Sequence, residues 1–161
     1  MRGDEFERLY SEHAQGLLGF LVYRTGNRAL AEDLLADTFE RVLKARRPFD
    51  PRQASRKTWL YSIALNLLRD HARRRDAEGR ALERSEAAPA SAERSLAGVA
   101  DRDALARALA TLSGEEREAV ALRFGADLTV PEMAKLTGVP LTTMEGRVYR
   151  GLRKLRLEIA E

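Results

Sequence analysis

The sequence predicts an all-α protein: two small helical domains joined by a flexible linker, the C-terminal one a helix-turn-helix. Ala, Leu, Arg and Glu are abundant, and the 161 residues include only 5 Pro and 11 Gly, a composition that favours helix. Apolar residues recur at helical spacing before residue 79 and after residue 100. Between them lies a stretch rich in Ala and Ser with few large apolar residues. We therefore expect domains at 1–78 and 101–161 and a linker at 79–100.

Helical periodicity indicates three to four helices in the first domain. One covers 6–22, and the next begins after Asn27, a suitable cap, and ends before Pro48, because proline disfavours helical geometry in the preceding residue. Another contains Trp59 and ends in the basic run 73–75. The expected core positions are Phe6, Leu9, Tyr10, Leu17, Leu18 and Leu21, then Leu30, Leu34, Leu35, Thr38, Phe39, Val42 and Leu43, then Trp59, Leu60, Ile63, Ala64, Leu67 and Leu68.

Three capping boxes predict three successive helices in the second domain. They are Ser113-x-x-Glu116, Thr129-x-x-Glu132 and Thr142-x-x-Glu145. Gly138, between the last two helices, suits a left-handed turn. The expected buried face of the last helix is Met144, Val148, Leu152 and Leu155. This layout is that of a helix-turn-helix, whose second helix enters the major groove of DNA.

Charges of the two signs are segregated, although the net formal charge is only +3. Residues 1–40 hold eight acids and four bases, residues 41–75 hold eleven bases and two acids, and residues 147–156 hold five bases and no acid. Each half therefore ends in a basic helix, which favours nucleic-acid binding. A solvated helix face without a ligand is the alternative for each.

The last helix carries the strongest DNA-binding pattern. Its candidate residues are Thr142, Thr143, Glu145, Arg147, Arg150 and Lys154, with the basic ones expected opposite the apolar stripe and no acid to balance them. The first turns of such a helix approach base edges, where Arg147 can pair with guanine. Glu145 either accepts from a cytosine amino group or caps the helix; it cannot fill both roles fully.

In the first domain, a basic face that includes an amide is a second candidate. Its residues are Asn66, Arg69, Arg73 and Arg74. Trp59 is either a core residue or a stacking platform for a base, and Phe49 in the preceding loop is either a loop anchor or a stacking residue. Asp33, Asp37 and Glu40 are ordinary solvated acids unless a partner binds them.

Composition excludes several classes of function. Cys is absent and only two His occur, which excludes disulfides, a catalytic thiol and a Cys/His zinc site. No apolar stretch approaches the roughly 20 residues that span a bilayer, and the start Met1-Arg-Gly-Asp-Glu leads into a polar amphipathic segment, from which we expect no signal peptide. No nucleophile, acid–base pair or phosphate-binding loop is visible. We therefore expect a cytoplasmic, non-enzymatic protein with no cofactor, no metal and no membrane insertion.

Four segments together resemble a known family. They are ALAEDLLADTFERVLKA, FDPRQASRKTWLYSIALNLLRDHARRR, LATLSGEEREAVALRF and PEMAKLTGVPLTTMEGRVYRGLRKL. In this order and spacing they resemble the extracytoplasmic-function group of the bacterial sigma-70 family, the minimal sigma factors with regions 2 and 4 only. The chain departs from many relatives at Gln53-Ala54, where they have Arg-Gly, and at Glu145-Gly146, where they often have Lys-Ser. The promoter sequences of relatives are therefore not carried over.

The resemblance implies a role for each candidate surface. Region 2 would bind the clamp helices of the largest RNA polymerase subunit through Asp33, Leu34, Asp37, Thr38, Phe39 and Arg41. It would meet the minus-ten element through Phe49, Ser55, Asn66, Arg69, Arg73 and Arg74, with the loop capturing a flipped base. The helix-turn-helix of region 4 would read the minus-thirty-five element. The implied function is recruitment of core polymerase to promoters and help in opening DNA, with an anti-sigma factor as an expected inhibitor.

Two rival functions fit parts of the pattern. A stand-alone helix-turn-helix regulator would bind its operator tightly without polymerase, usually as a symmetric dimer. A helical adaptor protein would have no DNA role, and loss of the basic residues of the last helix would leave its function intact.

Overall fold

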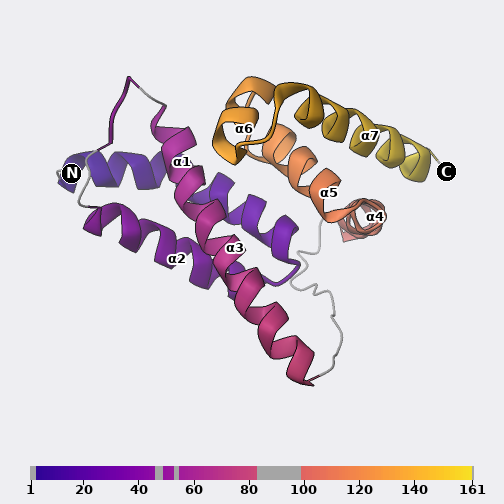
Figure 1. The fold of residues 1–161 in the computed structure, drawn as a ribbon, viewed down its shortest axis with the longest axis horizontal. Coiled ribbons are helices and arrows are strands. Elements are labelled where there is room, and N and C mark those ends of the chain that lie inside the picture. Colours follow the sequence, from indigo (N-terminus) through magenta and orange to yellow (C-terminus); the bar gives the residue numbers. More distant parts are fainter. Residues whose placement is uncertain (1–2, 46–48, 53–54, 83–98, 161) are drawn as a thin grey trace. The chain divides into compact units, whose positions relative to one another are not determined.

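A computed structural model describes residues 3–45, 49–52, 55–82 and 99–160, and these residues form helices without any strand. The chain divides into two compact units, Met1–Ala92 and Glu93–Glu161 (Figure 1). This confirms the all-α prediction of two helical units. The predicted linker lies partly in helix, because residues 79–82 and 99–100 belong to the flanking helices, and residues 83–98 lie outside the described part of the chain.

Unit 1 consists of α1 (Gly3–Thr25), α2 (Arg28–Lys44) and α3 (Arg56–Leu82). Helix α2 packs against both others, and α3 crosses α1 and α2 (Figure 1). The rings of Phe20 and Tyr61 meet edge to face with centroids 5.7 Å apart, and both are almost fully buried. Burial raises the pKa of the Tyr61 hydroxyl to about 12. The apolar pattern did not identify Phe20, Tyr61 or Leu65 as core, although each is buried.

The turn between α1 and α2 follows the sequence prediction. Gly26 has a φ of 69°, a left-handed conformation that glycine adopts readily, and Asn27 follows it as the N-cap of α2. The Asn27 side-chain oxygen accepts a hydrogen bond from the Leu30 backbone N–H at 3.1 Å. This short connection places α1 and α2 side by side as neighbours.

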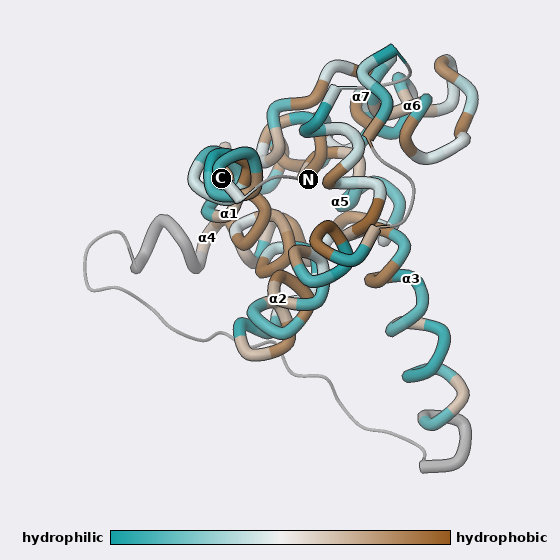
Figure 2. The backbone as a smooth tube through the Cα atoms, turned by 90° about the vertical axis from the view of Figure 1, so that its left-hand side faces the viewer, coloured by the Kyte–Doolittle hydropathy of each residue, from teal (hydrophilic) through white to brown (hydrophobic). Residues whose placement is uncertain are grey.

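Helix α3 is longer than predicted. It continues past Arg75 to Leu82 because Asp76, Ala77 and Glu78 contain neither a proline nor a capping signal that would end it. The second half of α3 is strongly hydrophilic (Figure 2). Two predicted core positions are also wrong: the side chains of Leu43 and Tyr10 are exposed, because the apolar stripe is broader than the surface that the neighbouring helices cover.

Unit 2 consists of α4 (Val99–Ala110), α5 (Gly114–Val120), the π-helical turn η1 (Ala121–Gly125), α6 (Val130–Thr137) and α7 (Leu141–Ile159). Helix α7 packs against α4, α5 and α6, and one core cluster joins Leu109, Leu112, Val120 and Leu155. Gly138, with a φ of 75°, ends α6 in the left-handed conformation and starts the turn to α7. The helix-turn-helix prediction is therefore confirmed.

Two of the three predicted capping boxes are present. Ser113 with Glu116 caps α5, and Thr129 with Glu132 caps α6. The third box is wrong, because α7 begins at Leu141 with Pro140 as its N-cap and no side-chain cap bond. Thr142 already lies inside the first turn, so Glu145 is too far along the helix to close a box.

Candidate functional site

The residues predicted to bind polymerase divide into an exposed and a buried set. Asp33, Asp37 and Arg41 recur every four residues and lie exposed along one face of α2. The other three predicted residues, Leu34, Thr38 and Phe39, are buried. Together these six residues therefore give α2 an outer polar face and an inner face that fixes it in the unit.

The buried set has clear structural partners. The Thr38 hydroxyl donates to the Leu34 carbonyl at 2.7 Å, which satisfies it inside the core. The Phe39 ring packs 4.8 Å from that of Tyr10 and 5.9 Å from that of Phe6, centroid to centroid. These contacts hold α2 against α1.

The exposed acids of α2 differ in their surroundings. Glu32 pairs with Arg28 at 3.3 Å and Glu40 with Lys44 at 3.4 Å, each four residues away. Within the described ranges, Asp33 and Asp37 have no ion-pair partner. Their negative charge is therefore available to a partner molecule.

The loop before α3 carries an aromatic contact. The Phe49 ring lies 5.5 Å from the Trp59 ring, and the Arg56 guanidinium lies 5.0 Å above Phe49. The Ser55 hydroxyl accepts from the Thr58 backbone N–H at 3.0 Å, at the start of α3. Phe49 and Ser55 are thus tied to the first turn of α3, while Gln53 and Ala54 lie outside the described residues.

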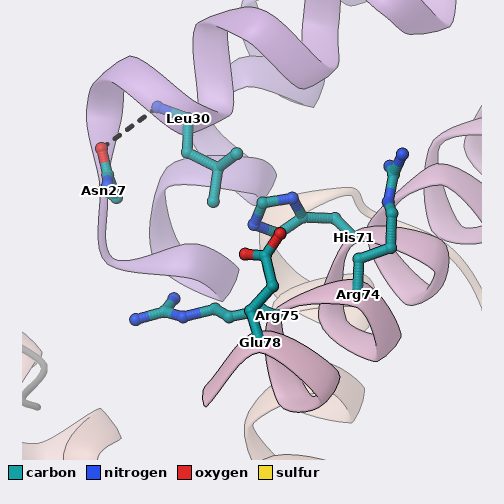
Figure 3. Close-up of a pocket in the computed structure, with 6 residues that line it drawn as sticks. All are labelled: Asn27, Leu30, His71, Arg74, Arg75 and Glu78. Carbon is teal, nitrogen blue, oxygen red and sulfur yellow. Dashed lines mark hydrogen bonds between the residues drawn. The ribbon is translucent and has the colours of Figure 1, made fainter. Parts of the chain in front are cut away.

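The basic part of α3 presents two faces. Asn66, Arg69 and Arg73 are three and four residues apart and share a face, on which Arg73 pairs with Asp70 at 3.4 Å. Arg74 lies to the side and lines an open hollow of about 600 Å³ toward the start of α2 (Figure 3). The hollow is lined by Asn27, Leu30, His71, Arg74, Arg75 and Glu78. Because both signs of charge line it, the hollow has no clear preference for an anion or a cation.

The basic residues of α7 are held by acids from another helix. Arg147 pairs with Glu115 at 3.0 Å, while Lys154 and Arg150 approach Glu116 at 2.8 and 3.7 Å. The prediction that no acid balances this face is therefore wrong, because it considered α7 alone. These cations do not lie opposite the buried stripe but beside it, along the seam with α5.

Glu116 is the centre of this network. It is only 7% exposed, and its carboxylate accepts from both the Ser113 backbone N–H and the Lys154 ammonium. The hydrogen bond from Lys154, followed by that from the Ser113 backbone, lowers the pKa of Glu116. The group therefore remains an anion despite its burial.

Gly151 allows α7 to lie close to α5. A Cβ at this position would stand 2.7 Å from the Val120 side chain and 3.7 Å from the Glu116 Cβ. The absence of a side chain brings the α7 backbone near enough for Lys154 and Arg150 to reach Glu116. The apolar periodicity of this helix predicted the neighbouring Leu152 as core and did not indicate the role of Gly151.

The outward side of α7 carries residues that the sequence analysis missed. Tyr149 is 66% exposed, and Arg153 and Arg156 are also exposed. They share a face with Thr142 because these positions recur at helical spacing. Thr143 and Glu145 are exposed near the same end. Counting positions from the buried Met144, Val148 and Leu155 would have located this face.

No helix in the described ranges is long and apolar enough to cross a membrane. In the same ranges no cluster of three or more His, Asp or Glu side chains is placed to hold a metal ion.

Comparison with known proteins gives two family matches and relatives that align with nearly all of this chain. Sigma-70 region 2 matches residues 9–78, and Sigma-70, region 4 matches residues 102–155. The RNA polymerase sigma factor CarQ of Myxococcus xanthus is 36% identical over 98% of this chain and 91% of its own length. The ECF RNA polymerase sigma factor BldN of Streptomyces coelicolor is 32% identical over 94% of this chain and 59% of its own length.

Two solved structures share the fold. One is the sigma factor RpoE in complex with the anti-sigma factor NepR from Bartonella quintana, with a TM-score of 0.87, 22% identity and 97% coverage of both chains. The other is CnrH in complex with the cytosolic domain of CnrY, with a TM-score of 0.74 and 24% identity over 99% of this chain and 90% of the other.

Proposed function

Because this chain belongs to the extracytoplasmic-function group of the sigma-70 family, and so is an RNA polymerase sigma factor for promoter-specific initiation, we propose that its two units divide that work. Unit 1 binds core polymerase and the minus-ten element, and unit 2 reads the minus-thirty-five element. The observation that carries this proposal is the segregation of charge: two aspartates on α2 that have no ion-pair partner among the described residues, and basic residues gathered on α3 and α7. A protein partner and DNA can then bind different helices.

Helix α2 is the proposed polymerase surface. Asp33, Asp37 and Arg41 make the contact with the clamp helices of the largest subunit, since they are exposed on one face. Leu34, Thr38 and Phe39 act from inside by fixing the position of that face. An unpaired carboxylate requires no internal ion pair to break before it meets a basic partner, which supports assigning the contact to the two aspartates.

The loop before α3 and the basic part of α3 are the proposed minus-ten surface. Phe49 and Ser55 belong to a loop whose aromatic rings offer a stacking surface for an unpaired base. Asn66, Arg69, Arg73 and Arg74 then meet the adjoining duplex, where the arginines contact phosphates and the exposed amide of Asn66 can pair with an adenine edge.

Helix α7 is the proposed minus-thirty-five reader. Its exposed first turns contain Thr142, Thr143 and Glu145, which are free of any capping role because Pro140 begins the helix. The Glu145 carboxylate can therefore accept from a cytosine amino group. Arg147, Arg150 and Lys154 lie along the α5 side of the reading face, and Tyr149 and Arg153 extend that face outward.

The two DNA contacts reinforce each other only when polymerase holds both units. Each module relies on a few phosphate contacts, so the chain by itself binds duplex weakly and with a steep salt dependence. Holding both modules on the enzyme makes the second contact effectively intramolecular. On this proposal the chain acts in the cytoplasm, without catalysis or a cofactor, and is kept inactive by an anti-sigma factor. The similar sigma factor RpoE was solved in complex with the anti-sigma factor NepR, which supports a partner of this kind.

Transcription with purified core polymerase tests the proposal. Start sites mapped after overproduction supply the templates, and run-off transcription should then depend on adding this chain. Asp37→Lys should reduce both co-elution with core enzyme and transcripts at least tenfold, because it reverses an unpaired charge at the interface. Glu7→Lys, an equal reversal at an exposed site on α1, is the matched control and should change neither.

A gel shift with and without core enzyme separates the rival functions. A sigma factor shifts promoter DNA strongly only with core polymerase, whereas tight binding without it would indicate a stand-alone regulator. Unchanged promoter use after Arg147→Ala and Arg150→Ala would favour a protein adaptor. No initiation with core enzyme from any mapped template would refute the proposed function.

A further inference from the structure

The first turn of α5 provides two adjacent acids that face the DNA-reading helix. Glu115 lies 3.0 Å from the Arg147 guanidinium, and Glu116 lies 2.8 Å from the Lys154 ammonium. Both contacts bridge residues more than thirty positions apart in the chain, so they exist only in the folded unit. Three cations proposed to lie along the DNA surface are thus paired before any DNA is present.

The two acids, Glu115 and Glu116, differ in their burial and in their contacts. Glu116 is buried, closes the capping box with Ser113 and contacts two α7 cations, Lys154 and Arg150. Moving the Glu116 side chain away would open the capping box at the start of α5 as well as separate the ion pairs. The Glu116 carboxylate therefore stays in place, and it keeps the Lys154 ammonium paired within the protein.

Among the residues that the structure describes, the Glu115 side chain has one polar partner, Arg147. The Glu115 side chain is 71% exposed, it takes no part in the capping box, and its ion pair is with Arg147. The Arg147 side chain is only 20% exposed, and its guanidinium pairs with this carboxylate beside the reading face. Exposed ion pairs of this kind are weak and easily exchanged.

We propose that Glu115 is a positioning residue that sets the specificity of the DNA-reading surface, an inference that rests on the proposed function of α7. Its carboxylate holds the Arg147 guanidinium in the free protein and gives it up to an acceptor on DNA. Any DNA must displace this internal anion, which weakens binding to every sequence. A site that offers Arg147 two acceptors, such as a guanine edge, recovers the lost interaction best. Non-specific DNA is thereby disfavoured.

The first test measures binding of the full chain to a fluorescent duplex of mixed sequence by anisotropy at low salt. Glu115→Gln keeps the side chain's size and removes its charge, so affinity should rise about two- to fivefold more than in the control. The matched control is Glu158→Gln, which removes one negative charge from an exposed position on α7. Thermal unfolding of Glu115→Gln should match wild type, which excludes a folding effect.

The coupling to Arg147 is tested by a double-mutant cycle. In an Arg147→Ala background, Glu115→Gln should bind DNA no better than Glu158→Gln does, because no guanidinium remains to release. With holoenzyme, Glu115→Gln should lower the ratio of promoter affinity to mixed-sequence affinity by a similar factor. Glu115→Asp, which keeps the charge, should restore most of that ratio.

The outcomes separate this inference from the function on which it rests. If Glu115→Gln behaves like Glu158→Gln, or if its gain persists without Arg147, the inference is overturned while the role of α7 stands. If Arg147→Ala itself leaves DNA binding and promoter use unchanged, the proposed role of this part of α7 fails instead.

Discussion

Units 1 and 2 both consist of packed helices, but the contacts that hold their helices together differ in kind. In unit 1 the described contacts between helices are mainly apolar and aromatic, such as Phe20 with Tyr61 and Phe39 with Tyr10. An ion pair between Arg56 and Glu5, at 4.0 Å, also joins two helices of unit 1, whereas in unit 2 several polar contacts cross between elements. Arg117 donates to the carbonyls of Leu109 and Leu112, and Glu116 accepts from Lys154.

Helix length accounts for much of this difference. The helices of unit 1 have 23, 17 and 27 residues, whereas α5 and α6 have 7 and 8. Helices that short are unstable by themselves, so unit 2 needs its capping boxes and the contacts of the buried Glu116 in addition to a core. The same Glu116 contacts hold Lys154 and Arg150 of the proposed DNA-reading helix, so stability and proposed recognition are coupled in unit 2 and separable in unit 1.

The largest expected effect comes from the core of unit 1. Phe20→Ala removes a ring that is 1% exposed and should lower the free energy of unfolding by about 3–5 kcal/mol. Trp59, the only tryptophan, lies in unit 1, so denaturant unfolding followed by its fluorescence reports this unit alone. Tyr23→Ala, on the same helix but 44% exposed, is the control and should cost less than about 1 kcal/mol. Equal losses in both variants would contradict the assignment of the core.

A smaller effect is expected where α7 meets α5. Gly151→Ala places a Cβ 2.7 Å from Val120, and the overpacking should cost about 1–3 kcal/mol and separate Lys154 from Glu116. Circular dichroism should show this loss while Trp59 fluorescence does not change. Gly16→Ala in α1 meets only the Tyr61 hydroxyl at an ordinary 3.7 Å and should be neutral or stabilising by up to about 1 kcal/mol. If Gly151→Ala is equally harmless, the close approach is not required.

The smallest expected effects are pH dependences in different ranges. Burial lowers the pKa of His13 in unit 1, so the folded state resists protonation and unit 1 loses stability as pH falls below about 6.5, by at most about 1.4 kcal/mol per pH unit. The pKa of Glu116 in unit 2 is also lowered. The ionised Glu116 therefore stabilises unit 2 above the ordinary glutamate pKa of about 4.3, and this stabilisation is lost as pH falls below that value. As pH falls, unit 1 should therefore lose stability before unit 2 does.

Paired variants check the assignment of these two ranges. His13→Gln should remove the first slope from Trp59-detected unfolding, and Glu116→Gln should remove the second from circular dichroism. A first slope that survives His13→Gln would show that another group causes it.

Local signals in the sequence predicted most of the fold. Asn27, Gly138 and the boxes at Ser113 and Thr129 act through neighbouring backbone groups, and the structure confirms each of them. The box at Thr142 failed because, although it has the right residue types, the N-cap of α7 is Pro140, two residues before Thr142.

Contacts between elements were beyond the reach of the sequence pattern. The periodicity of α7 identified its buried stripe, yet it contained no information that Glu115 and Glu116 would face Arg147 and Lys154. Likewise Leu34 and Phe39 were predicted to contact polymerase, but only packing against α1 shows that their side chains are buried. Spacing within one helix does not reveal which neighbour covers a face.

The division of work between the units is tested most directly by run-off transcription on two templates. One carries a mapped promoter, and the other is the same promoter with its upstream element replaced. Asp37→Lys should lower transcripts from both templates by the same factor, since it weakens binding of core polymerase. The double variant Arg147→Ala with Arg150→Ala should lower transcripts only from the intact promoter, to the amount obtained from the template with the replaced upstream element. Equal loss on both templates from the α7 variant would contradict the assignment of upstream reading to unit 2.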